Sequence, residues 1–106
     1  MDPIVVLSTV DTPELAQKIA TALVEAGEAA CVNIIPGVRS IYKWKGMMCD
    51  DAELFLVIKS SWARFEAIRD RIITLHSYEV PEVIALPITG GESRYLMWLG
   101  SMVTQG

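Results

Sequence analysis

The stretch Val38-Arg39-Ser40-Ile41-Tyr42-Lys43-Trp44-Lys45 alternates like a β-strand, in which successive side chains point to opposite faces. One face would carry Val38, Ser40, Tyr42 and Trp44, and the other Arg39, Ile41, Lys43 and Lys45. Residues 53–60 alternate in the same way, so we expect a return strand there, with residues 46–51 as the turn. The two strands predict an antiparallel hairpin. Its first arm is one extended segment over residues 30–45, with a bend or bulge at Pro36-Gly37.

Strand and helix signals alternate on both sides of this hairpin. Short apolar runs with β-branched residues predict strands over residues 4–7 and 83–86, and Pro87 favours an edge position for the second. Apolar residues at helical spacing predict three helices, over about 13–26, 62–75 and 92–103. Asp11 or Thr12 would cap the first helix, and Ser60 or Ser61 the second, which would carry Arg64 on its polar side.

The order strand, helix, strand, strand, helix, strand, helix indicates an α+β fold. Right-handed crossovers place the first two helices on one face of a four-stranded antiparallel sheet. We therefore predict a ferredoxin-like βαββαβ sandwich with an extra C-terminal helix, as a single domain over residues 1–106. The other sheet face is left uncovered, and we expect Ser8, Tyr42 and Trp44 to need a covering partner there.

Composition narrows the classes of function. The hydrophobic fraction of 52% is high for 106 residues, which points to an oligomer. A net charge of −4 with scattered basic residues argues against nucleic-acid binding. No apolar run reaches the roughly 20 residues that span a bilayer, and no secretory signal is visible, so we expect a cytoplasmic protein without a membrane partner. Without such a signal, Cys31 and Cys49 are expected to be reduced thiols.

The loop His76-Ser77-Tyr78-Glu79-Val80-Pro81-Glu82 concentrates the candidate chemical groups. It contains the only histidine of the chain, and Pro81 keeps it extended between a helix and a strand. His76, Glu79 and Glu82 are candidate metal ligands, since imidazole and carboxylate both bind divalent ions. The alternative is a structural histidine that hydrogen-bonds a neighbouring group. No cofactor is expected to be needed for folding.

Three further side chains and a group of sulfur-containing residues could either bind a ligand or simply pack against other residues. Tyr42, Lys59 and Tyr78 are candidates to line a small-ligand cleft, with Lys59 and Tyr78 suited to an anion, although packing is the ordinary role of Tyr42. Cys31 is expected to be a buried thiol. Cys49 and the adjacent pair Met47-Met48 could bind cuprous copper, but a subunit contact is the favoured interpretation.

The sequence resembles the CutA family of divalent-ion tolerance proteins over essentially its whole length. The segments that carry this resemblance are Ala30-Cys31-Val32-Asn33-Ile34-Ile35-Pro36-Gly37, Ser40-Ile41-Tyr42-Lys43-Trp44-Lys45-Gly46, Leu56-Val57-Ile58-Lys59-Ser60, His76-Ser77-Tyr78-Glu79-Val80-Pro81-Glu82 and Tyr95-Leu96-Met97-Trp98-Leu99. One departure is Ser77, which stands where the family usually has proline after the histidine and which would loosen the loop.

The resemblance implies a tight homotrimer of ferredoxin-like subunits, similar to nitrogen-signalling PII proteins. It also implies a role in copper and divalent-metal tolerance, with a metal ion, Cu(II) or another divalent metal, or a small ligand bound in clefts between subunits. Two alternatives stay open. One is a structural trimer without a metal function, and the other is an enzyme with His76 and Glu82 as acid and base. No catalytic motif supports the enzyme, so a non-enzyme is expected.

Overall fold

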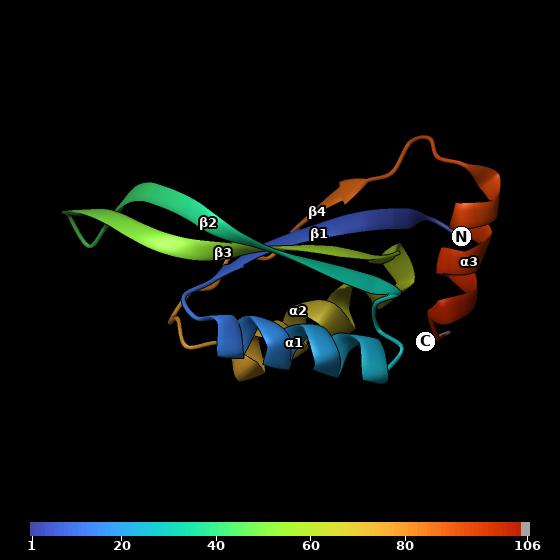
Figure 1. Ribbon diagram of the computed structural model, residues 1–106, viewed down its shortest axis with the longest axis horizontal. Coiled ribbons are helices and arrows are strands. Elements are labelled where there is room, and N and C mark those ends of the chain that lie inside the picture. Colours follow the sequence, from blue (N-terminus) through green and yellow to red (C-terminus); the bar gives the residue numbers. More distant parts are fainter. Residues whose placement is uncertain (105–106) are drawn as a thin grey trace.

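The computed structural model describes residues 1–104, and Figure 1 shows how its elements are arranged. They are β1 (Pro3–Val10), α1 (Pro13–Glu25), β2 (Cys31–Trp44), β3 (Met47–Ser61), the 3-10 helix η1 (Trp62–Arg64), α2 (Phe65–Leu75), β4 (Ile84–Pro87) and α3 (Ser93–Met102). The strands form one antiparallel sheet in the order β2-β3-β1-β4. Helices α1 and α2 lie on one face, while α3 lies at one end (Figure 1). The predicted ferredoxin-like α+β fold with an extra C-terminal helix is confirmed.

The core lies between the sheet and the layer of α1 and α2. Its side chains are buried: Ile4, Val6, Val10, Ile19, Leu23, Leu56, Ile58, Ile68 and Ile72. The even-numbered residues of β1 all point into this core, because side chains alternate along a strand. The prediction that Ser8 lies on the uncovered face is therefore wrong, and its side chain is 0% exposed against the helices.

The hairpin is tighter and longer than the sequence pattern predicts. Its turn consists of Lys45 and Gly46 alone, both with positive φ, at 50° and 80°. This is the backbone that a two-residue hairpin turn requires. The predicted turn over residues 46–51 is wrong, because residues 47–51 pair with β2. The predicted irregularity at Pro36-Gly37 is confirmed, since the register shifts between Ile35 and Val38.

Helix α1 begins as predicted, whereas α2 does not. Thr12 caps α1, with its Oγ1 accepting a hydrogen bond from Leu15 N at 3.1 Å. Neither serine caps α2: Ser60 Oγ instead donates to Glu28 O at 2.5 Å, and Ser61 makes no side-chain capping bond. The chain passes from β3 through η1 into α2, so both serines still lie in the strand when the turn begins.

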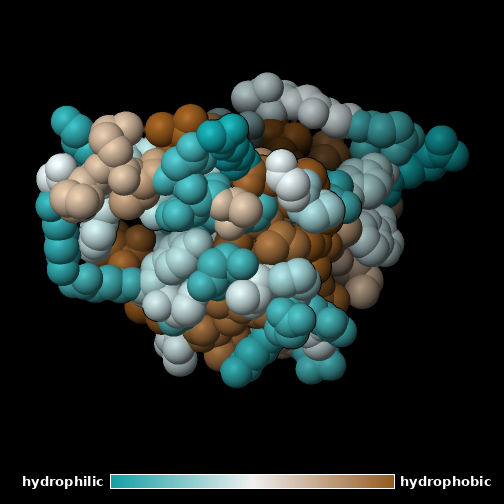
Figure 2. Space-filling view, turned by 60° about the vertical axis from the view of Figure 1, so that its left-hand side comes forward, coloured by the Kyte–Doolittle hydropathy of each residue, from teal (hydrophilic) through white to brown (hydrophobic). Residues whose placement is uncertain are grey.

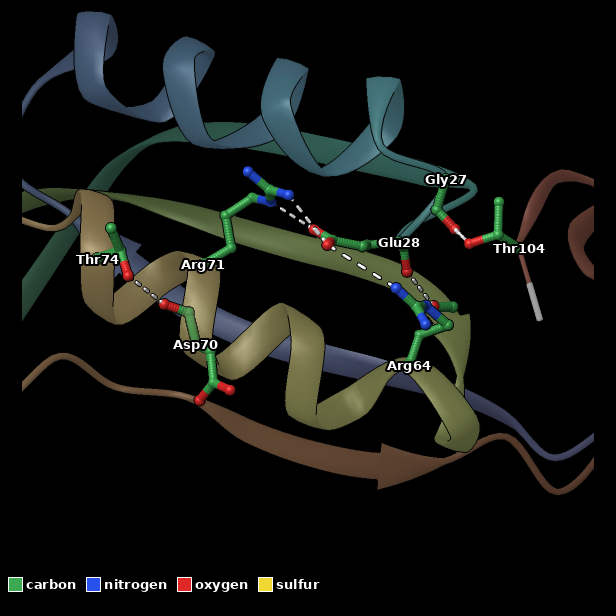
Figure 3. Close-up of polar contacts among 8 residues, drawn as sticks. Gly27, Glu28, Arg64, Asp70, Arg71, Thr74 and Thr104 are labelled. Atoms are coloured by element: carbon green, nitrogen blue, oxygen red, sulfur yellow. Dashed lines mark hydrogen bonds and ion pairs between the residues drawn. The ribbon is translucent and has the colours of Figure 1, made fainter. Parts of the chain in front are cut away.

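A buried ion-pair cluster ties the turn after α1 to α2 (Figure 3). The Glu28 side chain is only 9% exposed, and it accepts hydrogen bonds from Arg71 Nε at 2.5 Å and Arg71 Nη2 at 3.1 Å. Arg64 Nη2 lies 3.8 Å from the same carboxylate. Arg64 is therefore not on a solvent-facing side of α2, as its position in the helical pattern predicted. We refer to Glu28, Arg64 and Arg71 as the Glu28 cluster.

The sheet face opposite α1 and α2 keeps much apolar surface in contact with solvent. Side chains on this face and along the hairpin arms are exposed, among them Ile35, Tyr42, Trp44, Met47, Ile84 and Leu86. Figure 2 shows hydrophobic residues in patches between hydrophilic ones. Exposed apolar patches of this kind on a small domain mark a contact region. Among residues 1–104, no helix has the length and apolar character needed to cross a membrane.

Candidate functional site

A cleft of about 650 Å³ separates the β2–β3 hairpin from the loop 76–82. The cleft lining combines aromatic and acidic side chains from both walls, including Tyr42, Glu53, Tyr78, Glu79 and Glu82. Four of the six predicted site residues therefore meet here, far apart as they are in the sequence. The antiparallel pairing of β1 with β3 brings this about, because it sets the end of β1 beside the middle of β3.

Each phenol in the cleft donates a hydrogen bond to a carboxylate. Tyr78 Oη donates to Glu53 Oε2 at 2.6 Å, and Tyr42 Oη donates to Asp51 Oδ2 at 2.5 Å. Burial and the bond to Glu53 raise the pKa of Tyr78, and the bond to Asp51 raises the pKa of Tyr42. Both phenols are therefore held as neutral donors.

The two acceptors, Glu53 and Asp51, were missed as site residues. Glu53 is only 7% exposed although it lies in a strand at the base of the hairpin. A carboxylate at the start of the apolar alternation of residues 54–58 is the signal that could have identified it, since buried carboxylates need partners. Asp51 gives no such signal, because it lies in what the sequence predicts to be a turn.

The His76 ring lies behind the cleft, with both nitrogens engaged. His76 Nε2 is 2.7 Å from Thr9 O, and Nδ1 accepts a hydrogen bond from Tyr78 N at 3.1 Å. The ring also lies 4.5 Å from the Tyr78 ring, measured between centroids. In this arrangement His76 positions Tyr78 and joins the loop to β1. For His76 to bind a metal ion, as the sequence predicts, its ring would have to give up one of these hydrogen bonds.

Glu79 and Glu82 lie at the mouth of the cleft. Glu79 Oε2 is 3.5 Å from Lys45 Nζ, and both side chains are largely exposed. Among residues 1–104, no group of three or more histidine, cysteine, aspartate or glutamate side chains is arranged to hold a metal ion. One chain alone thus does not offer the closed ligand set of a tight metal site, although the carboxylate oxygens suit a weakly held divalent ion.

Lys59 lies away from this cleft. It is six residues from Glu53 along β3, a separation of roughly 20 Å in a strand. Its Nζ lies 5.8 Å from the centroid of the Tyr95 ring on α3. Within a single chain, Lys59 therefore does not line the cleft that contains Tyr42 and Tyr78, and a place for it there stays a prediction for an assembly.

Ser77 does not leave the loop unanchored. Its Oγ donates a hydrogen bond to Asp11 Oδ1 at 3.1 Å, so a polar contact with the end of β1 takes the place of a rigid proline.

The two cysteines are both free and half-buried, and they lie at opposite ends of the β2–β3 hairpin. Cys31 pairs with Lys59 and Cys49 pairs with Tyr42. No disulfide joins them within one chain, and their reduced state stays a prediction.

The chain is similar to known proteins over nearly all of its length. A family model described as CutA1 divalent ion tolerance protein matches residues 4–102. The divalent-cation tolerance protein CutA of Thermus thermophilus is 50% identical over 95 residues, which cover 90% of this chain and 92% of that protein. The crystal structure of CutA1 from Oryza sativa has a TM-score of 0.97 at 40% identity and covers 100% of this chain and 97% of that chain.

A plant relative is considerably longer. The chloroplastic protein CutA of Arabidopsis thaliana is 47% identical over 96 residues, or 91% of this chain. Those residues are 53% of the Arabidopsis protein, so the chain spans about half the length of that relative. The similarity in all three cases includes both the hairpin and the 76–82 loop that form the cleft.

Proposed function

Because this chain belongs to the CutA1 family of divalent ion tolerance proteins, we propose that it is a non-catalytic homotrimer that binds divalent metal ions. The proposed site is the cleft between the hairpin and the loop 76–82, with Cu(II) as the first candidate ion. The observation that carries the proposal is the meeting of Glu53, Glu79 and Glu82 in one cleft. A cleft lined by charges of one sign raises the local concentration of ions of the other sign.

Exposed edges and apolar surface support the homotrimer. Strands β2 and β4 are the two edges of the sheet, and they differ in length and in sequence. Contact between two different edges is head-to-tail, and such contacts close into rings when the rotation permits. The exposed Met47 and Met48 at the hairpin end, with Ile84 and Leu86 on β4, supply apolar surface for the contact.

A neighbouring subunit would also complete the metal site. The carboxylates of one chain provide oxygen ligands, but His76 is occupied and Glu79 is already paired with Lys45. Groups from a second copy, together with water, would supply the remaining ligands. We therefore expect modest affinity, which falls as protons compete with the metal for the carboxylates at acid pH.

Light scattering and calorimetric titration with Cu(II) at neutral pH test the two parts separately. We expect a trimer at micromolar concentration and saturable copper binding, which the double variant Glu79→Gln/Glu82→Gln loses. His76→Ala reports whether the ring is itself a ligand, and Cys49→Ser is the matched control for adventitious binding through sulfur. A monomer would contradict the assembly. Unchanged binding in the double variant, with loss in Cys49→Ser, would remove the cleft from the proposal.

The competing function is a structural scaffold that forms the trimer without binding metal, and the copper titration separates it from the metal-binding function.

A cytoplasmic location is also part of our proposal. The Arabidopsis relative is described as chloroplastic, so the location differs among members of the family. Cell fractionation with an antibody to this chain tests the location, and recovery in an organelle or in the periplasm would contradict it.

A further inference from the structure

An ammonium group lies against two residues that line the cleft, Trp44 and Glu79. Lys45 Nζ lies 5.7 Å from the centroid of the Trp44 ring and 3.5 Å from Glu79 Oε2. An aromatic face together with a carboxylate is the arrangement by which proteins recognise alkylammonium ions. Lys45 lies in the hairpin turn, where its φ is 50°, and its ammonium group links the hairpin to Glu79 of the loop.

Deeper in the cleft lies a buried carboxylate without a counter-cation. Glu53 is 7% exposed, and it accepts a hydrogen bond from the neutral hydroxyl of Tyr78. No lysine or arginine among residues 1–104 forms an ion pair with it, whereas the other buried glutamate, Glu28, has two arginines. A carboxylate can accept about four hydrogen bonds, so Tyr78 leaves it with room for a cationic donor.

The walls between these two acidic positions are aromatic. Tyr42, Trp44 and Tyr78 all line the cleft, and its volume of about 650 Å³ is that of a site for a small organic molecule. A bare metal ion would make little use of this aromatic surface. An alkyl chain with an ammonium group at each end would place its methylenes against the rings and its charges at the carboxylates.

We infer that this cleft binds a linear aliphatic polyamine, long enough to place one ammonium group at Glu53 and another where it displaces Lys45 from Trp44 and Glu79. The inference does not depend on metal binding, since it uses the aromatic walls and a competition with Lys45. Lys45 then sets the affinity, because a ligand must displace it before the outer position is free.

Calorimetric titration of the full chain with spermine, a linear polyamine, in EDTA and at constant ionic strength, tests the inference. We expect saturable binding of spermine, weaker binding of n-butylammonium, which has a single charge, and none of 1,4-butanediol, which has no charge. Glu79→Gln changes an exposed side chain and should weaken spermine binding by about threefold to tenfold. Glu53→Gln should weaken it more, because the inner charge is buried.

The variant at Lys45 is the sharpest comparison. Lys45→Ala should raise the affinity for spermine by about threefold to tenfold, because it removes the competing ammonium group of the protein. Lys43→Ala makes the same change in net charge two residues away, but the ammonium group at Trp44 and Glu79 belongs to Lys45, so this control should leave the affinity nearly unchanged.

Two results would overturn the inference. One is wild-type protein that binds spermine no better than 1,4-butanediol. The other is an equal change in affinity for the two lysine variants, which would reduce the effect to net charge. If Glu53→Gln does not fold, the affinities of Glu79→Gln and of the two lysine variants still test the inference. The copper titration without amine is a separate measurement, so the failure of one proposal is distinguishable from the failure of the other.

Discussion

Replacing Glu28 by glutamine removes the only negative charge of the Glu28 cluster and keeps nearly the same shape (Figure 3). Arg64 is 15% exposed and Arg71 is 37% exposed, so the first arginine would stay buried without a counter-charge. Arg64 Nε is already buried without a hydrogen-bond partner among the described residues, which leaves it little chance of compensation. We expect Glu28→Gln to destabilise the fold strongly.

The magnitude follows from burial. Removal of one partner from a buried ion pair typically costs about 3–5 kcal/mol. Since Arg71 can turn toward water, we reduce this to about 2–4 kcal/mol for the free energy of unfolding. The matched control is Asp50→Asn, which breaks an ion pair with Arg39 of the same bidentate geometry, at 2.7 and 2.5 Å. The Arg39 and Asp50 side chains are 73% and 46% exposed, so the free energy of unfolding should fall much less in Asp50→Asn.

Urea unfolding of the wild type, Glu28→Gln and Asp50→Asn at one protein concentration is the assay. The reasoning predicts a large drop in the free energy of unfolding for the first variant and a small one for the second. Equal losses would refute it, because burial would then have no influence on what these two similar pairs contribute.

Three further predictions concern the core, the last helix and the assembly. Leu56→Ala, at a fully buried position of β3, should lower the free energy of unfolding by about 2–5 kcal/mol in urea, and a smaller loss would mean that the core collapses around the gap. Bonds from Arg94 and from Tyr95 N lower the pKa of Glu92, so its cap on α3 is intact above the ordinary pKa of 4.5 and is lost as pH falls through the lower folded value. NMR of the Tyr95 amide should report this loss in wild type, and its persistence in Glu92→Gln would assign the change to another group. Trimerisation should make the melting temperature fall on hundredfold dilution, and a constant value with reversible unfolding would contradict coupled assembly.

Most of the fold could be predicted because its signals are local. Thr12 and Pro13 mark the start of α1 by their own chemistry, and the alternation of residues 38–45 marks β2. The hairpin turn was mispredicted because residues 47–51 are polar or flexible and read as a loop, whereas their pairing with β2 holds them in a strand. Arg64 was placed in solvent because its partner, Glu28, is distant in sequence.

The cleft could be predicted only in part. The loop 76–82 was identified from the density of its chemical groups, but the sequence does not reveal that Thr9 and Tyr78 occupy both nitrogens of His76. Glu53 was missed because its importance comes from burial, which depends on the register of β1 against β3. Lys59 was grouped with Tyr42 although strand spacing alone places it roughly 20 Å from Glu53.

The location of a bound metal ion tests the central proposal most directly. Crystals grown with Cu(II) at neutral pH, with anomalous scattering measured at the copper edge, would show where the ion lies. Our account predicts a peak beside Glu79 and Glu82 in each of three equivalent clefts, with a ligand from the neighbouring subunit. Copper only at the sulfur atoms of Met47, Met48 and Cys49, with no peak in the clefts, would contradict it.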